Sequence, residues 1–287
     1  MLGRKGMVGQ AVYEILSRSG LLTVEGTERA TPSSPLYFEA TSGTAGLQSL
    51  WRRKGGYAFL INCIGMTKPT IEERDPLSVE RAIHVNALLP HRLALFASEV
   101  GARVIHLSTD CVFSGKGHRY TEDAPHDPLD VYGKTKSLGD VIAPEVLTIR
   151  CSVIGPDPVG HRGLLEWFLG HPEGKDVTGY TDSLWNGVTT LQFATLCRRI
   201  IAEDRFERLR DESPVHHFCP NHEISKYELL RLFAEVYGRR IVVNPGPTPG
   251  GPLSRLLVTK HRGLHEMFGE ARGMADALRE MVQEIAR

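Results

Sequence analysis

The sequence predicts an α/β fold in which a doubly wound parallel sheet is followed by a smaller C-terminal portion. Three observations predict it: short apolar runs alternate with helical stretches, a glycine triplet opens a helix near the N-terminus, and the alternation gives way to glycine and proline after residue 150. With 287 residues, 41% of them hydrophobic, the chain can bury a large core in one long domain or two.

The glycine triplet, Gly3, Gly6 and Gly9, is typical of a turn that cradles a phosphate. Glycine lets the backbone turn sharply and lets an anion approach the main chain, and the following helix end attracts the anion. The apolar spacing after the turn predicts that helix, and Gly20 is placed to end it. A triplet alone is weak evidence, since 29 residues of this chain are glycine.

Five short apolar runs have the composition of strands buried on both faces. They lie at residues 21–24, 36–38, 57–65, 103–108 and 146–150. Parallel strands separated by helices form a doubly wound sheet. In this reading the runs are successive strands of one sheet.

Two helical stretches carry clear internal signals. The longest, residues 76–102, contains Pro90, which predicts a kink because proline removes a backbone hydrogen bond. The stretch at 225–238 begins with Ser225 and Glu228 at capping-box spacing and ends at Gly238.

Charge and cysteine usage exclude several classes of protein. The net charge is zero and the pI is near 7.2, so neither nucleic acid nor a membrane surface is expected as a partner. Five widely spaced cysteines suit reduced thiols, and no signal peptide or long apolar run is present, so we expect a cytoplasmic protein. No metal is expected, because no glutamate occupies the metalloprotease position beside His261 and His265 and no cysteine pair supports zinc.

Polar residues that can take part in catalysis or ligand binding follow the strand at 103–108. Ser108, Thr109 and Asp110 stand at its carboxyl end, where open α/β sheets bind ligands. Tyr132 and Lys136 are four residues apart, so they share one face of a helix. A lysine ammonium beside a phenol is expected to lower the tyrosine pKa toward the working range, although the same spacing is common on solvated helices.

Six motifs occur in order over nearly the whole chain up to about residue 240. They are GxxGxxG, NCIG at 62–65, VNA at 85–87, STDCVFSG at 108–115, YGKTK at 132–136 and LTIRCSVIG at 147–155. Together they resemble an extended short-chain dehydrogenase/reductase, and the branch that is most similar is the dTDP-4-dehydrorhamnose reductases.

The resemblance implies Thr109, Tyr132 and Lys136 as the catalytic residues. NADPH would then reduce C4 of a nucleotide-linked 4-keto-6-deoxy sugar, and Tyr132 would protonate the new alkoxide. The residues that the resemblance places at the cofactor, besides Tyr132 and Lys136, are Gly3, Gly6, Met7, Val8, Gly9, Arg29, Asn62, Cys63, Ile64, Gly65 and Asn86. A nucleotide sugar is the expected ligand. Whether the chain forms a homodimer stays open.

The motifs identify the sugar substrate less closely than they identify the reaction. Related reductases commonly have RTSW where this chain has RCSV, so Val153 replaces an expected aromatic wall, and STDYVFDG becomes STDCVFSG. The residues expected on the substrate side are Thr109, Val112, Phe113, Val153, Tyr180, Trp185 and Val188. For Trp185, packing in the core is an equal alternative.

NADPH is preferred over NADH as the expected cofactor, and NAD stays open. Arg29 lies where related reductases carry a basic residue for the ribose 2′-phosphate, and Arg4 or Lys5 can add charge. Glu25 argues for NAD, because an acidic residue at this strand end can bind both ribose hydroxyls.

The change of pattern after residue 150, together with the resemblance, predicts two parts of the chain. Residues 1–155 form an NADP-binding, Rossmann-like domain, with 187–219 folding back onto it, and residues 156–186 and 220–287 form a substrate-binding portion. Two other functions stay open: a sugar-nucleotide epimerase or dehydratase, disfavoured because Cys111 replaces the acid of the dehydratase TDE segment, and a non-catalytic NADP-binding regulatory subunit.

Only Met1 and Leu2 precede the glycine turn, where this fold has a buried central strand. A strand usually has about five or six residues. We therefore expect the native protein to begin about five to ten residues upstream, with a short apolar strand that ends at Leu2. The alternative is a short form that binds its cofactor weakly or not at all.

Overall fold

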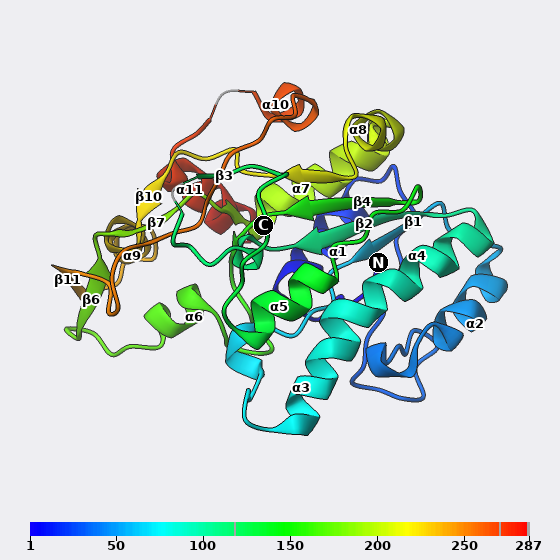
Figure 1. The fold of residues 1–287 in the computed structure, drawn as a ribbon, viewed down its shortest axis with the longest axis horizontal. Helices are drawn as coiled ribbons and strands as arrows, with labels where there is room; N and C mark the ends of the chain where they lie inside the picture. The colour runs from blue at the N-terminus through cyan, green and yellow to red at the C-terminus, as the bar shows by residue number, and fades with distance from the viewer. Residues whose placement is uncertain (118, 270, 286–287) are drawn as a thin grey trace.

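The computed structural model describes residues 1–117, 119–269 and 271–285. It has two lobes: a parallel sheet with helices on both faces, and a smaller lobe built around residues from the second half of the chain (Figure 1). In the part of the chain that the structure describes, no helix has the length and apolar character needed to cross a membrane.

The larger lobe is organised by a parallel sheet whose ladder follows the order β1-β2-β4-β9. Its strands are β1 (Phe59–Asn62), β2 (Arg103–Ser108), β4 (Val146–Arg150) and β9 (Val215–His217). Successive side chains enter opposite cores, as Val104 and Ile105 of β2 show. This confirms the predicted α/β fold with a doubly wound parallel sheet.

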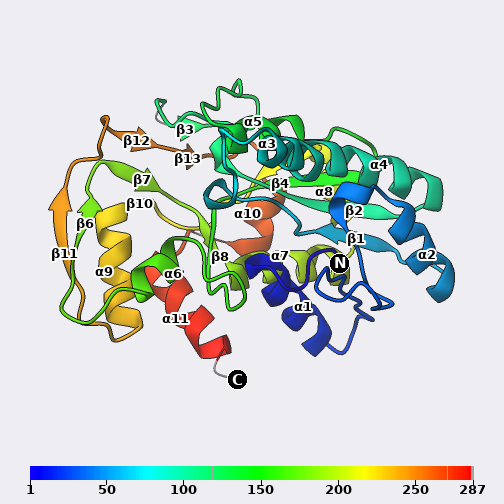
Figure 2. The ribbon, with the colours of Figure 1, turned by 90° about the horizontal axis from the view of Figure 1, so that it is seen from below.

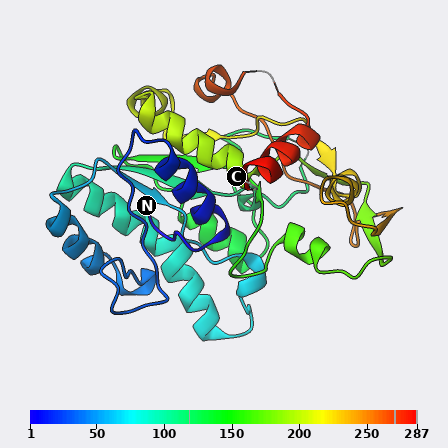
Figure 3. The ribbon, with the colours of Figure 1, turned by 180° about the vertical axis from the view of Figure 1, so that it is seen from behind.

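Helices cover both faces of this sheet, so the lobe has three layers (Figure 2). One face carries α1 (Met7–Arg18) and α7 (Thr190–Ala202), which lie side by side (Figure 3). The helices on or near the other face are α2 (Ala45–Lys54), α3 (Pro76–Ala82), α4 (Leu89–Val100) and α5 (Val131–Leu138). Helix α8 (Phe206–Glu212) leads into β9.

The long helical stretch is interrupted, although not at Pro90 itself. A π-helical segment, Ile83–Leu88, separates α3 from α4, and Pro90 lies in the first turn of α4. Proline lacks the N–H that would bond to the carbonyl of Asn86, so the regular ladder cannot continue through this point. The interruption places Asn86 at the centre of the irregular turn.

The predicted strands at 21–24 and 36–38 do not form ladders. Residues 25–27 instead run beside Met1 and Leu2, and one isolated bridge joins Glu28 to Tyr37. Leu2 bonds to Ile61 and Cys63 on its other side. The segments thus follow the strand order of a doubly wound sheet. Met1 and Leu2 have too few backbone N–H and C=O groups to pair with residues 25–27 as regular strands.

The smaller lobe packs helices against short strands. Its strands are β6 (Asp176–Tyr180), β7 (Ser183–Trp185), β10 (Ile224–Ser225), β11 (Val242–Gly246) and β12 (Leu253–Ser254). Its helices are α6 (Leu164–Leu169), α9 (Lys226–Val236) and α11 (Met274–Ile285), which share one core. The capping box of Ser225 and Glu228 begins α9 as predicted, and Gly238 follows its end with a φ of 62°.

Short parallel pairs join the two lobes. Strands β3 (Arg119–Tyr120) and β13 (Leu256–Leu257) pair with each other, as do β5 (Val153–Ile154) and β8 (Val188–Thr189). Helix α10 (Gly263–Phe268) falls in the range assigned to the second portion, yet its apolar residues belong to the core beside α1 and α7.

Candidate active site

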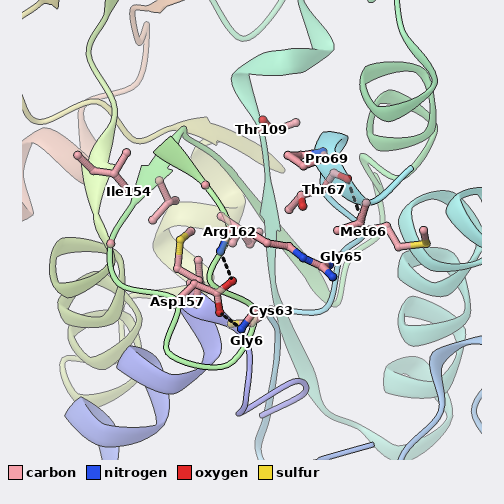
Figure 4. Close-up of a pocket in the computed structure, with 18 of the residues that line it drawn as sticks. Gly6, Cys63, Gly65, Met66, Thr67, Pro69, Thr109, Ile154, Asp157 and Arg162 are labelled. Atoms are coloured by element: carbon pink, nitrogen blue, oxygen red, sulfur yellow. Dashed lines mark hydrogen bonds between the residues drawn. The ribbon is translucent and has the colours of Figure 1, made fainter. Parts of the chain in front are cut away.

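A cleft of about 550 Å³ opens at the carboxyl ends of the sheet strands, bordered by the loop at 155–163 (Figure 4). Open α/β sheets bind ligands at this edge. Eleven of the residues that the resemblance places at the cofactor or the substrate line the cleft: Gly6, Met7, Val8, Arg29, Cys63, Ile64, Gly65, Thr109, Tyr132, Lys136 and Val153. Segments that are far apart in the chain thus meet in one place.

The three glycines of the N-terminal turn have three different environments. Gly3 has a φ of 82°, which only glycine adopts without strain, and it forms the sharp turn. Gly6 caps α1 and lines the cleft, with only the Gly3 carbonyl oxygen near the position of a Cβ atom. Gly9 is buried, and it brings α1 against the turn. The first amides of α1 therefore point to a place that an anion can reach.

Asn86 fixes the wall of the cleft that follows β1. Its Oδ1 atom accepts a hydrogen bond from the Met66 amide at 2.8 Å, and its Nδ2 atom donates to the Met66 carbonyl at 2.9 Å. The same Nδ2 atom donates to the Thr135 hydroxyl of α5 at 3.2 Å. Asn86 does not line the cleft, so it supports the wall rather than forming its surface.

Asn62 has a similar supporting place at the end of β1. Its side chain is buried, accepts the Ile64 amide at 3.2 Å and lies 3.1 Å from His106 Nδ1. Gly3 and Gly9 likewise shape the turn without lining the cleft. These predicted cofactor residues are therefore near the cleft but outside its surface.

Helix α5 places Tyr132 and Lys136 on the cleft together. Asp130 caps this helix by accepting the Gly133 amide at 2.8 Å. The Lys136 ammonium donates to the Leu107 carbonyl at 2.7 Å, at the end of β2. The shared face predicted from the four-residue spacing is therefore present.

The electrostatics of Tyr132 differ from the expectation. Burial raises the pKa of Tyr132 well above its usual value, and a hydrogen bond with Thr109 opposes this only in part. Burial also lowers the pKa of Lys136 to about 8, while Asp140 acts in the opposite direction. Desolvation of the phenolate is the largest effect, and the charges of Asp110 and Asp130 act in the same direction, so Tyr132 keeps its proton.

Thr109 follows β2 and begins a short 3₁₀ turn. Its hydroxyl accepts the Cys111 amide at 3.1 Å and donates to Asp110 at 3.1 Å. Burial also raises the pKa of Cys111 to about 12, so its thiol stays protonated in the same wall. Thr109 is thus held in a fixed position beside the Tyr132 phenol.

Five residues expected on the substrate side do not line the cleft. Val112 and Phe113 are buried in a small core, where the Phe113 ring stacks on Tyr120 at 4.2 Å. Val188 is buried in the main core. These expectations were wrong because the strand-end motif lines the cleft only as far as Cys111, and the apolar residues that follow turn into the core.

Trp185 and Tyr180 belong to the smaller lobe. Trp185 is buried in that lobe's core, with the Lys226 ammonium 5.4 Å from its ring centre, so the packing alternative is correct. Tyr180 ends β6, away from the residues that line the cleft.

Sequence reasoning missed the loop at 155–163. Asp157 organises it by accepting the amides of Gly160 at 2.9 Å and Arg162 at 3.3 Å. Figure 4 shows the Arg162 side chain reaching across the cleft toward Gly65. No described carboxylate forms an ion pair with the Arg162 side chain. The glycine and proline cluster signalled an irregular segment, but nothing in the sequence showed which way it folds.

The charged residues around the predicted ribose site separate into two groups. Arg29 and Lys5 line the cleft, and the Arg29 side chain is 76% exposed with Glu39 at 3.9 Å. Glu25 instead bonds to the Tyr57 hydroxyl and borders a different, small cavity. Arg4 pairs with Glu28 at 2.9 Å.

The chain matches known proteins over most of its length. A family model, the RmlD substrate binding domain, matches residues 1–248. The spore coat polysaccharide biosynthesis protein SpsK of Bacillus subtilis is 28% identical over 220 residues, which cover 72% of this chain and 73% of that protein.

Two other relatives match over shorter regions. A dTDP-4-dehydrorhamnose reductase of Streptomyces griseus is 34% identical over 146 residues, which cover 50% of this chain and 44% of that protein. The methionine adenosyltransferase 2 subunit beta of Xenopus laevis is 34% identical over 141 residues, which cover 48% and 40%. The chain thus spans less than half of each of these two proteins.

Solved structures share the fold. A dTDP-4-dehydrorhamnose reductase of Clostridium acetobutylicum superposes with a TM-score of 0.76 at 19% identity, covering 100% of this chain and 98% of that one. The Bacillus anthracis reductase in complex with NADP gives 0.76 at 15% identity, covering 99% and 97%. The chain therefore belongs to the RmlD substrate binding domain family and has the dTDP-4-dehydrorhamnose reductase-like fold of extended short-chain dehydrogenases/reductases.

Proposed function

We propose that this chain is an NAD(P)H-dependent reductase of a nucleotide-linked 4-keto-6-deoxy sugar. The observation that carries the proposal is the convergence of Thr109, Tyr132 and Lys136 on the cleft that also receives the first turn of α1. A proton donor, a cation and an anion-binding helix end are the groups that carbonyl reduction with a dinucleotide needs.

Tyr132 is the proton donor in this proposal. Burial raises its pKa, so the phenol is protonated at neutral pH and can donate to an alkoxide that forms beside it. The Thr109 hydroxyl holds the same oxygen, and the Lys136 ammonium supplies positive charge near the developing anion. The bound nicotinamide supplies the hydride.

The residues at the cleft fit a dinucleotide. The space beside Gly6 and the first amides of α1 suit a pyrophosphate, because a side chain at Gly6 would project where the anion must approach. Arg29 and Lys5 favour a cofactor with a 2′-phosphate, so NADPH is the preferred cofactor. Glu25 is directed elsewhere, which removes the main argument for NADH.

The substrate side of the cleft has one aliphatic wall and one cation. Val153 lines the cleft, and Arg162 of the loop that follows β5 reaches across the cleft. A guanidinium without a carboxylate partner suits the diphosphate of a nucleotide sugar or of the cofactor. We assign the sugar to the space between Val153 and Thr109.

The test is to incubate purified protein with NADPH and a panel of dTDP- and UDP-linked 4-keto sugars, and to follow the loss of NADPH absorbance. Consumption with at least one ketone supports the reductase. Conversion of a sugar without net NADPH consumption indicates an epimerase or dehydratase instead. No reaction with any ketone, despite tight NADPH binding, contradicts the proposal.

A non-catalytic, NADP-binding regulatory subunit is the second candidate. It is favoured by the 34% identity to a methionine adenosyltransferase subunit over 141 residues. The complete set of Thr109, Tyr132 and Lys136 on one cleft argues against it, because a binding role alone needs no proton donor. A homodimer and a cytoplasmic location stay predictions.

A further inference from the structure

A buried ion pair lies behind the cleft, between the end of α5 and strand β4. The Arg150 Nε atom donates to Asp140 Oδ2 at 2.6 Å, and both side chains are only 5% exposed. The Ser108 hydroxyl donates to the other carboxylate oxygen, Oδ1. Both oxygens of Asp140 are therefore engaged, and its carboxylate cannot turn without breaking a buried bond.

Asp140 follows Lys136 by four residues, and both residues reach the same strand end. The Lys136 ammonium bonds to the carbonyl of Leu107, and the Asp140 carboxylate bonds to the side chain of Ser108, the next residue of β2. Lys136 lines the cleft, whereas Asp140 does not. Asp140 therefore cannot touch a ligand there, and it can act on the chemistry only through its neighbours.

The groups around the Lys136 ammonium come from several elements. Burial lowers the pKa of Lys136 to about 8; Asp140 is the first group that raises it, followed by Cys151 and Cys63. The Lys136 charge also acts on His106 of β2, and burial together with this charge keeps the pKa of His106 well below its usual range. Burial raises the pKa of both thiols, Cys151 and Cys63, so they carry no charge at neutral pH. Asp140 is thus the one anion among the described groups that act on Lys136.

We propose that Asp140 is a positioning residue for the proposed reaction: its carboxylate, anchored by Arg150 and Ser108, keeps Lys136 in the ammonium form inside the cleft. The inference rests on the proposed function for its catalytic consequence. The competing reading is purely structural, with the ion pair only tying α5 to β4. The two readings differ in what happens to the charge of Lys136.

The decisive measurement is an NMR titration of the lysine side-chain signals in the ligand-free protein, with the Lys136 signal assigned by Lys136→Met. Asp140→Asn is expected to lower the pKa of Lys136 by about one unit, whereas Asp140→Glu keeps it near the wild-type value. Asp127→Asn is the matched control, because that carboxylate bonds to Ser114 and does not act on Lys136. An unchanged Lys136 pKa in Asp140→Asn overturns the proposal.

Asp140→Asn leaves Arg150 buried without its partner, so this variant can lose its fold. The double variant Asp140→Asn/Arg150→Gln removes both charges and serves as the second test. Arg150 is not among the groups that act on Lys136, so the double variant is still expected to lower the Lys136 pKa. Thermal unfolding shows which variants are folded, and an unchanged pKa in the folded double variant also refutes the proposal.

The activity of the full chain gives a separate readout. If Lys136 must be protonated, kcat/KM falls as pH rises through its pKa, and this alkaline limb moves to lower pH in Asp140→Asn. A loss of activity that is equal at all pH values, with the limb unmoved, indicates only a structural role. If the wild-type protein reduces no ketone, the reductase proposal fails, and the NMR titration still decides the role of Asp140.

Discussion

Gly9 lies directly against the carbonyl group of Gly3: a Cβ atom on Gly9 would stand 2.0 Å from the Gly3 oxygen. At Gly6, the corresponding distance to the same oxygen is 3.6 Å, which is an ordinary contact. One glycine of the turn is therefore required for packing, and the other leaves room beside the helix end.

This difference predicts that two alanine substitutions affect different properties, stability in one case and NADPH binding in the other. Gly9→Ala is expected to lower the free energy of unfolding by about 1 to 3 kcal/mol, because backbone atoms must move apart. Gly6→Ala is expected to keep the fold and to weaken NADPH binding at least about tenfold, because its methyl group occupies the approach to the helix amides. Urea unfolding and NADPH titration measure the two effects. A Gly9→Ala protein as stable as Gly6→Ala contradicts this account of the turn.

Tyr132→Phe separates proton transfer from cofactor binding. Turnover is expected to fall by roughly 10² to 10⁴, the contribution of a positioned acid, while NADPH affinity stays nearly constant. The measurement is steady-state kinetics beside a fluorescence titration of NADPH. Turnover close to that of the wild type removes Tyr132 from the mechanism.

Arg29→Ala tests the choice of cofactor. Loss of a guanidinium from the proposed ribose site is expected to weaken NADPH binding about tenfold and to leave NADH binding unchanged, because only NADPH has the 2′-phosphate. Arg18→Ala is the matched control, since Arg18 pairs with Glu284 at the other end of α1. Equal losses for both cofactors, or none, show that Arg29 does not read the phosphate.

Arg162→Gln tests the loop that crosses the cleft. We expect weaker binding of the cofactor or of the nucleotide sugar, by about tenfold at low salt and less at high salt, because exposed charges are screened. Arg231→Gln, on the surface of the smaller lobe, is the control. Binding that is unaffected at every salt concentration places Arg162 outside both ligand sites.

Stability is expected to fall when the pH drops below 6.5, before most carboxylates titrate. Burial lowers the pKa of His217 in the folded protein from 6.5 to about 4. The unfolded chain therefore binds a proton first, and the stabilisation, complete above pH 6.5, is lost as pH falls toward 4. This one histidine accounts for about 3 kcal/mol at most.

Urea unfolding at pH 7.5 and pH 5 measures this loss. His217→Asn is expected to show a smaller difference between the two pH values, because one titrating group is gone. The Asn variant also loses contacts with Arg150 and Val258, so only the difference between pH values is informative. The same difference in variant and wild type refutes the assignment to His217.

Local patterns in the sequence predicted the strands that are buried on both faces. The runs at 103–108 and 146–150 are strands β2 and β4 because each has neighbours on both sides and apolar residues for two cores. The runs at 21–24 and 36–38 have similar composition but no ladder to join, and pairing partners are a tertiary property.

The candidate site was predictable where a motif sits on one element. Tyr132 and Lys136 share a face because helix geometry alone requires it. Arg162 and Asp140 could not be found in this way, since their places depend on how a loop and a strand from elsewhere fold against the cleft. The direction of the Tyr132 pKa shift was wrong because the phenol is buried beside Asp110 and Asp130, and the sequence shows neither the burial nor these neighbours.

The single amide of Asn86 joins the backbone at Met66 to the hydroxyl of Thr135. Thr135 lies between Tyr132 and Lys136 on α5, so the side chain of Asn86 ties the cleft wall that follows β1 to helix α5. We expect a change at either end to be transmitted to the other. Substitutions in the wall at 63–67 are therefore expected to shift α5 as well, so we expect the two sides of the cleft to change together in evolution.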